Sequence, residues 1–262
     1  MKKEKELSVT RLHQRNCILR ESDHRYIWDP EGIAEEMAVS VTGVTSFDKP
    51  PVDYSRWPEA APRGDHVHRA MEALANNQTE VAICEHAEAA GDENAWEAGP
   101  ESWARFMDEH GTTSPEGIDC SAWIDQLVAM DFWSEMQTIA TEHTMVKRSK
   151  SLGGQLDLIA ERTNPKTGEV TIQLIDLKTK SASWNGPSKA DLLAYRQQFG
   201  GYLYLISDGD DARGGCWVDE CRTLIVTPEK TEWLPRFGLE DCYMQWEDCW
   251  LRYSLHQELN PF

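Results

Sequence analysis

The chain has 262 residues, of which 40% are hydrophobic, and its formal net charge is −19. This length can bury one sizeable hydrophobic core, so we expect residues 1–262 to form a single domain. No apolar run approaches the roughly 20 residues that span a bilayer, and the first residues contain no apolar stretch typical of a signal peptide. The composition argues against a membrane protein and predicts a soluble, intracellular one.

The negative charge, taken alone, argues against a nucleic-acid ligand, because proteins bind phosphates through Lys and Arg. The charge is unevenly distributed, however. Residues 80–145 contain fifteen acidic residues and one basic residue, Arg105, whereas residues 143–202 contain nine basic and five acidic residues. The acidic stretch is typical of a solvated helical surface. The later stretch has the positive balance that a phosphate ligand requires.

The first part of the chain predicts strands followed by a helix. Short apolar stretches interrupted by Asp-Pro and Gly indicate strands or a hairpin over residues 16–47, including Val39-Ser-Val-Thr-Gly-Val-Thr. Apolar residues at helical spacing then predict a helix that begins at about Gly64 and Asp65.

The composition of the middle of the chain indicates a helical insertion. Residues 76–117 are polar and acidic and contain glycine breaks, which indicates short helical pieces. The apolar residues of 121–141 recur at helical spacing and predict one longer amphipathic helix. We therefore expect a helical, acidic insertion over about 76–140 and a catalytic core over about 141–230.

The core begins with two strand-like runs, 154–161 and 170–178, joined by a segment that contains Asn-Pro and Gly. These turn residues predict a β-hairpin. Apolar residues at helical intervals predict a helix over about 189–206, and a β-branched run predicts a strand over 222–227. Residues 239–259 are typical of a closing helix.

The hairpin carries side chains suited to phosphodiester chemistry. Residues two apart on a strand project from the same face, so Asp176 and Lys178 are expected side by side. Asp157 on the neighbouring strand adds a second carboxylate, the minimum for a hard ion such as Mg²⁺ or Mn²⁺. Such an ion polarises a phosphate and lowers the pKa of a bound water. An isolated Asp-x-Lys is more often a surface ion pair, so the neighbouring motifs decide whether this one is catalytic.

Three motifs occur in order: Gly154-Gln-Leu-Asp157, Asp176-Leu-Lys178 and Gln198-Phe-Gly-Gly-Tyr202. The series resembles that of RecB-like nucleases in the PD-(D/E)XK superfamily. The resemblance implies that Asp157, Asp176 and the carbonyl of Leu177 bind the metal and that Lys178 assists the attacking water. It also implies that Gln198 and Tyr202, which share a helical face, hold the lysine and the DNA backbone in position.

An upstream pattern, Arg63-Gly-Asp-His-Val-His68, resembles the histidine motif of the same family and implies that His68 is a further metal ligand. His66 is a rival, but residues two apart on a helix point in different directions, so one ion is not expected to bind both. Glu72, on the face of His68, could orient its imidazole. Glu142 matches a glutamate that contacts the metal through water.

Basic residues around the motifs are candidate phosphate contacts that would position DNA without reading its sequence. They are Lys147, Arg148, Lys150, Lys180, Lys189 and Arg196.

The resemblance implies a restriction-endonuclease-like α/β fold, with a central mixed sheet flanked by helices, and a Mg²⁺- or Mn²⁺-dependent deoxyribonuclease. The chain is similar to single-domain phage exonucleases and to the mitochondrial genome maintenance exonuclease. This implies action on single-stranded DNA ends in recombination, repair or replication, in the cytoplasm of a bacterial or phage-infected cell. A helicase or a single-strand annealing protein would be the partner. The alternatives are a flap or branch endonuclease and a non-catalytic DNA-binding protein.

The seven cysteines are odd in number and scattered, which indicates reduced thiols. Because some related nucleases hold an iron–sulfur cluster with one early and three late cysteines, Cys17 with three of the late cysteines is an alternative. The late cysteines lack the tight spacing typical of cluster binding. They are Cys216, Cys221, Cys242 and Cys249.

Overall fold

The computed structural model describes residues 17–20, 25–28, 34–50, 54–77, 103–210 and 217–259. Its centre is a six-stranded mixed sheet in the order β4-β6-β7-β8-β9, with β5 also paired to β6. These strands are β4 (Val39–Ser40), β5 (Met136–Lys147), β6 (Leu152–Thr163), β7 (Val170–Thr179), β8 (Glu220–Val226) and β9 (Thr231–Trp233). β5, β6 and β7 are antiparallel neighbours, whereas β8 runs parallel to β7 and β4 parallel to β6.

A second, three-stranded antiparallel sheet comes from the start of the chain. It consists of β1 (Cys17–Arg20), β2 (Arg25–Trp28) and β3 (Glu35–Glu36). β1 and β2 form the hairpin expected in this region. Two short 3₁₀ turns, η1 (Tyr54–Arg56) and η2 (Arg148–Lys150), connect other elements.

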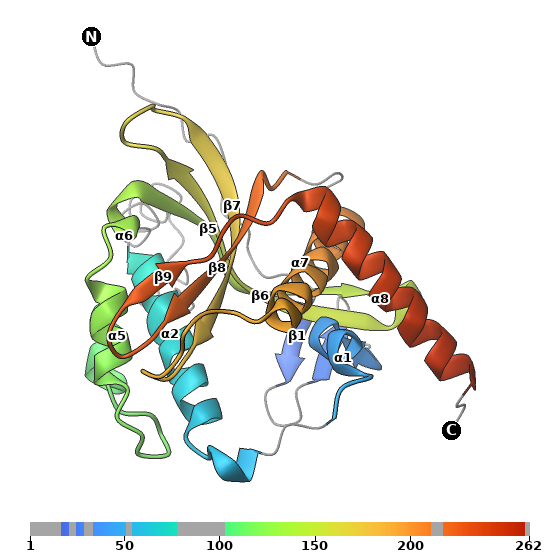
Figure 1. Ribbon diagram of the computed structural model, residues 1–262, viewed down its shortest axis with the longest axis horizontal. Coiled ribbons are helices and arrows are strands. Elements are labelled where there is room, and N and C mark those ends of the chain that lie inside the picture. The colour runs from blue at the N-terminus through green and yellow to red at the C-terminus, as the bar shows by residue number, and fades with distance from the viewer. Residues whose placement is uncertain are drawn as a thin grey trace.

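Helices cover both faces of the central sheet (Figure 1). One face carries α1 (Val41–Ser46), α7 (Lys189–Asp208) and α8 (Leu239–Leu259). The other carries α2 (Ala60–Asn77), α4 (Trp103–Glu109), α5 (Ser121–Val128) and α6 (Phe132–Glu135). Two hydrophobic clusters follow this division: Leu156 and Leu174 pack with α7, and Leu158 and Leu177 pack with α2. The predicted fold class, a mixed sheet flanked by helices, is confirmed.

The predicted core elements are also confirmed. β6 and β7 form the expected hairpin, and Gly168 in its turn has a φ of +69°, in the left-handed region that favours glycine. The helices predicted over 189–206 and 239–259 are α7 and α8, and the strand predicted over 222–227 is β8.

The helix predicted over 121–141 is wrong in its second half. The chain forms α5 and the short α6, and then enters β5 at Met136. The ladder to β6 runs from Met136 to Lys147, and β-branched Thr138, Ile139 and Val146 suit it. Pairing with a distant strand therefore overrode a local helical spacing of apolar residues.

Two other boundaries differ from the prediction. Residues 41–46 form α1 instead of a strand, because the Ser40 hydroxyl accepts a hydrogen bond from the Gly43 amide at 2.9 Å and caps a helix. α2 begins at Ala60, before the predicted start at Gly64, since a proline at position 62 is tolerated in a first helical turn.

The predicted acidic insertion is described only in part. Residues 78–102 lie outside the described residues, and residues 103–135 contain the short helices α4, α5 and α6 before β5 begins. In the part of the chain that the structure describes, no helix is long and apolar enough to cross a membrane.

Close packing of α7 against α8 depends on a glycine. A Cβ atom at Gly200 would overlap the carbonyl oxygen of Cys242 in α8. Gly64 in α2 differs, because a Cβ atom there would meet only the Thr179 hydroxyl oxygen, at an ordinary 3.7 Å. A side chain is therefore excluded at Gly200 but has room at Gly64.

We expect Gly200→Ala to destabilise the protein by about 1–3 kcal/mol, because α7 and α8 must move apart. Gly64→Ala is the matched control and should stabilise by about 0.5–1 kcal/mol, because alanine restricts the unfolded chain without a clash. Urea denaturation of both variants measures the difference. Equal effects of the same sign would contradict this account of the packing.

Candidate active site

β6 and β7 separate at the site. Their ladder ends at the pair Leu158–Ile175, although β7 remains paired with β8 as far as Thr179. The same edge of β6 pairs with β4 only at its first two residues. Residues 154–157 therefore face a gap in the sheet. Asp157 is the first residue beyond the last β6–β7 pair, and its carboxylate accepts a hydrogen bond from the Leu177 amide at 2.7 Å.

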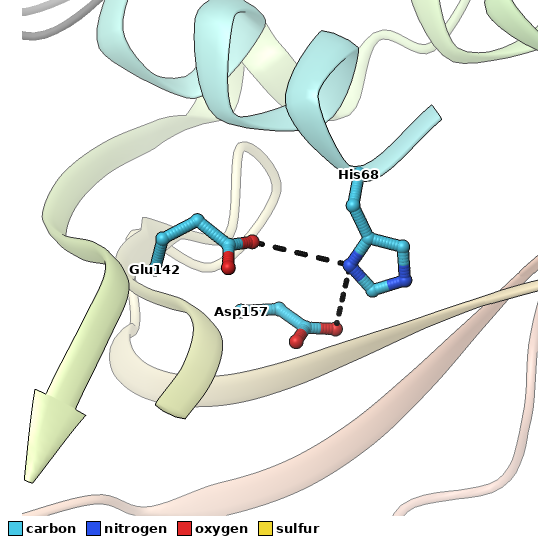
Figure 2. Close-up of side chains that lie close together, drawn as sticks. All are labelled: His68, Glu142 and Asp157. Carbon is cyan, nitrogen blue, oxygen red and sulfur yellow. Dashed lines mark ion pairs between the residues drawn. The ribbon is translucent and has the colours of Figure 1, made fainter. Parts of the chain in front are cut away.

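Three potential metal ligands meet beside this gap. His68 descends from α2 toward Glu142 of β5 and Asp157 of β6 (Figure 2). The imidazole Nδ1 lies 3.5 Å from Asp157 Oδ2 and 3.9 Å from Glu142 Oε1. One ligand atom from each residue lies within 4.8 Å of the others. The three side chains could thus share one ion.

Glu142 has a strained backbone. Its φ is +42°, a value that non-glycine residues rarely adopt, and it lies within a strand. Such a conformation costs on the order of 1 kcal/mol or more and is found most often at functional sites. The Gln155 side-chain amide donates a hydrogen bond to the Glu142 carbonyl at 2.9 Å and supports it. Glu142 lies opposite Asp157, between the pairs Thr141–Leu158 and His143–Leu156, and its carboxylate faces His68.

A second group of side chains lies beside the first. The Lys178 ammonium is 2.8 Å from the Asp176 carboxylate, and Gln198 of α7 donates to the same carboxylate at 2.9 Å. Gln198 also donates to the Tyr202 hydroxyl at 2.9 Å. The helix α7 therefore fixes Asp176, and Asp176 fixes the lysine.

The site brings several ionisable side chains together where they are buried from solvent, and this shifts their pKa values. Burial lowers the pKa of His68, but Asp157 and Glu142 outweigh this effect and raise the pKa to about 9. Burial raises the pKa of Asp157 and, despite the opposing charge of Lys178, raises that of Asp176 to about 6. Burial also lowers the pKa of Lys178, and its neighbouring carboxylates raise it overall.

These donors fit a divalent ion. Glu142 Oε1 is a buried acceptor without a hydrogen-bond donor among the described residues, an arrangement that costs free energy unless a cation is bound. Carboxylates with one imidazole suit ions such as Mg²⁺ and Mn²⁺. The ion would supply a polarised phosphate and an activated water.

The structure modifies the expected ligand set. Glu142, expected to act through water, belongs to the close group with His68 and Asp157, whereas Asp176 lies outside that group. Leu177 is buried, and its amide is the partner of Asp157. The residues predicted from the motifs therefore lie close together, but Glu142 takes the place expected for Asp176 in the close group.

The other α2 residues lie as follows. His66 is buried away from the group, with Nε2 3.1 Å from the Gly111 carbonyl oxygen and its ring against Phe106. Glu72 is half-buried one turn beyond His68. Of the two histidines, His68 alone reaches the carboxylates.

Most of the predicted phosphate contacts lie elsewhere. Lys147 pairs with Asp208 at 3.3 Å and Arg148 with Glu35 at 2.5 Å, and Lys150 lies over the Trp250 ring. These three follow Glu142 by five residues or more, which is about 16 Å along a strand. Their charges are used within the protein.

Two further basic candidates have different surroundings. The Arg196 guanidinium lies over the Phe237 ring, and residues two apart on α7 face different ways, so it points away from Gln198. Lys180 follows β7 directly and lies two residues beyond Lys178. Of these five, Lys180 is therefore the one beside the site, whereas Lys189, the sixth candidate, is exposed at the start of α7.

Tyr26 of β2 is a site residue that the sequence did not reveal. Its ring packs on Gly153, where any Cβ atom would overlap it. Burial first, and then the charge of Glu142, raise the pKa of the phenol to about 12. The hairpin that carries Tyr26 is far from the motifs in sequence and has no motif of its own, so only the fold could place it here.

The described cysteines do not form a metal site. Among the described residues, the one trio of histidine, cysteine or acidic side chains close enough to share an ion is the His68 group. Cys17 packs near Val146, whereas Cys221, Cys242 and Cys249 lie in the α7 and α8 core. All four are buried. Cys216 lies outside the described residues.

Comparison with known proteins identifies the family. The profile of the PD-(D/E)XK nuclease superfamily matches residues 49–232, which is more than half of the chain. The protein is thus a metal-dependent nuclease by class. The chain belongs to the PD-(D/E)XK nuclease superfamily, and its sheet and helices are the restriction-endonuclease-like fold of that family.

A search of curated proteins gave no match. A solved structure with similarity to this chain is the crystal structure of SSO0001, with 13% sequence identity and a TM-score of 0.26, covering 71% of this chain and 74% of that chain. A likeness at this level carries no argument about function.

Metal binding should depend on pH. Below about pH 9 the His68 imidazole is protonated, and an ion must displace that proton to bind Nδ1. The apparent affinity for Mn²⁺ should therefore rise between pH 6 and 8, by up to about tenfold per pH unit for one released proton. Isothermal titration calorimetry measures the Mn²⁺ affinity, and buffers of different ionisation enthalpy give the number of protons released. An affinity that does not change over this range would contradict the proposed role of His68.

Proposed function

We propose that this nuclease is a Mg²⁺- or Mn²⁺-dependent exonuclease of the RecB-like branch that hydrolyses phosphodiester bonds from single-stranded DNA ends. The observation that carries the nuclease chemistry is the meeting of His68, Glu142 and Asp157 beside Lys178, which Asp176 holds at 2.8 Å. This arrangement combines an ion site with a cation next to it, and both can stabilise the charge that develops during phosphodiester hydrolysis.

Each side chain has a definite task in the proposed reaction. His68, Glu142 and Asp157 would hold the ion, and Asp176, next to Lys178, would be a further ligand. The Lys178 ammonium orients the attacking water and stabilises the charge that develops on the phosphate. Gln198 keeps Asp176 in place, and Tyr202 keeps Gln198 in place.

The preference for single-stranded ends rests on the similarity of the three motifs, in order and spacing, to single-domain exonucleases. We propose a role in DNA recombination, repair or replication in the cytoplasm, with a helicase or a single-strand annealing protein as partner. A flap or branch endonuclease would use the same catalytic side chains, so the substrate test below separates the two.

The test of activity uses linear DNA labelled at the 5′ or 3′ end, single- or double-stranded, with Mg²⁺ or Mn²⁺. Lys178→Ala and Asp157→Asn should each lower kcat by about 10²–10⁴-fold, because each removes a group that acts on the water or the ion. Lys166→Ala is the matched control: this lysine lies in the turn of the same hairpin and is exposed. Unchanged cleavage by Lys178→Ala would show that the site is wrong.

A circular single strand tests the requirement for an end. Cleavage of linear but not circular DNA supports an exonuclease, and the label that is released first gives the polarity. Cleavage of the circle would rule out a strict exonuclease and favour the endonuclease. Binding of DNA without cleavage under any of these conditions would favour the non-catalytic alternative.

A further inference from the structure

We propose that Arg63, held over the Trp123 ring, binds a backbone phosphate of the DNA next to the one that is hydrolysed. This inference rests on the proposed function and adds a DNA contact that the motifs did not assign. It begins from the position of Arg63 in α2, five residues before His68, which is about 7.5 Å along the helix axis. Its neighbour Gly64 lies against Thr179, the residue after Lys178. Arg63 therefore lies where α2 passes the end of the catalytic strand.

An aromatic platform fixes this arginine. The guanidinium carbon lies 4.9 Å from the centroid of the Trp123 ring, within the range of a cation–π contact. The indole Nε1 of Trp123 donates a hydrogen bond to the Lys180 carbonyl at 2.9 Å. α2 and α5 lie side by side on the same face of the sheet (Figure 1), and this bond ties both to the segment after β7. The guanidinium is thus held in place before any ligand binds.

The charge of Arg63 has no acidic partner within the described residues. Its side chain is half-buried, and Nε is buried without a hydrogen-bond acceptor. Seven of the eleven other described arginines have carboxylate partners within 4.0 Å: Arg20, Arg25, Arg105, Arg148, Arg162, Arg236 and Arg252. An arginine kept free of such pairing beside a nuclease centre is suited to an external anion, and the planar guanidinium matches the oxygens of a phosphate.

The position also selects which phosphate is bound. The ion site and Lys178 act on the scissile phosphate, and Arg63 lies about one and a half helical turns from His68. The roughly 7.5 Å between Arg63 and His68 along α2 exceeds the rise of about 3.4 Å per phosphate of one DNA strand, so the guanidinium is placed for a phosphate next to the scissile one. Lys180, whose carbonyl holds Trp123, projects from the same segment and adds positive charge there. Such contacts position the strand and do not read its bases.

The test measures how salt affects the binding of a fluorescent oligothymidylate by fluorescence anisotropy with Mg²⁺ present. It is carried out in the Lys178→Ala background, which keeps the ion ligands and blocks cleavage. Adding Arg63→Gln should weaken binding by about tenfold or more at low salt. It should also reduce the slope of log K against log salt by about 0.7, the value for one phosphate contact on a single strand.

Two further variants make the result specific. Arg63→Lys keeps the charge but loses the planar fork, and should give intermediate affinity with a nearly unchanged salt slope. Arg222→Gln is the matched control, because Arg222 also lies over a tryptophan ring, Trp233, and also has a buried Nε without an acceptor. Arg222 pairs with Ile175, about 10 Å before Lys178 along the sheet, so its loss should leave the slope unchanged.

The outcomes separate this inference from the proposed function. If the unmodified protein cleaves DNA and Arg63→Gln binds with the same affinity and slope, Arg63 is not a phosphate contact. A lower melting temperature of Arg63→Gln with an unchanged slope would give Arg63 a structural role and also overturn the inference. If the unmodified protein neither binds nor cleaves DNA, the proposed function itself fails.

Discussion

The site depends on one hydrogen bond between a side chain and the backbone of a neighbouring strand. Where β6 leaves β7, the Leu177 amide loses its place in the ladder, and a buried amide without an acceptor would cost about 1–3 kcal/mol. The Asp157 carboxylate replaces the missing acceptor at 2.7 Å. The same carboxylate faces His68. The residue that allows the sheet to open is therefore also a candidate ligand in the opening.

The opening brings together groups from both faces of the sheet. Leu177 packs on the α2 side and Leu174 on the α7 side, so Asp176 and Lys178 belong to the α7 side. His68 arrives from α2, on the other side, and influences the titration of Asp176. A closed ladder between β6 and β7 would separate these groups. The gap lets one helix supply an imidazole and the opposite helix fix the lysine.

Function here conflicts with stability. Acidic groups are gathered where solvent is scarce, which raises the pKa of Asp157 and Asp176, and Glu142 has a strained backbone. Lys178 and His68 offset part of the repulsion. A bound cation would reduce the remaining repulsion between the carboxylates. Such perturbed ionisable groups are characteristic of catalytic sites. The strongly acidic composition does not contradict DNA binding, because the balance of charge near the motifs differs from that of the whole chain.

The sequence by itself determined the β6–β7 hairpin, the helices α7 and α8, and the position of Asp176 beside Lys178 on one strand. These depend on local signals: alternation along a strand, helical spacing, turn residues and short motifs. Only the tertiary structure decided that residues 136–147 form a strand, that Glu142 joins the ion group, and that Tyr26 lies beside it. It also decided that Arg148 is paired with Glu35, whereas Arg63 has no acidic partner among the described residues. Each of these depends on contacts between residues far apart in the chain, which local patterns do not encode.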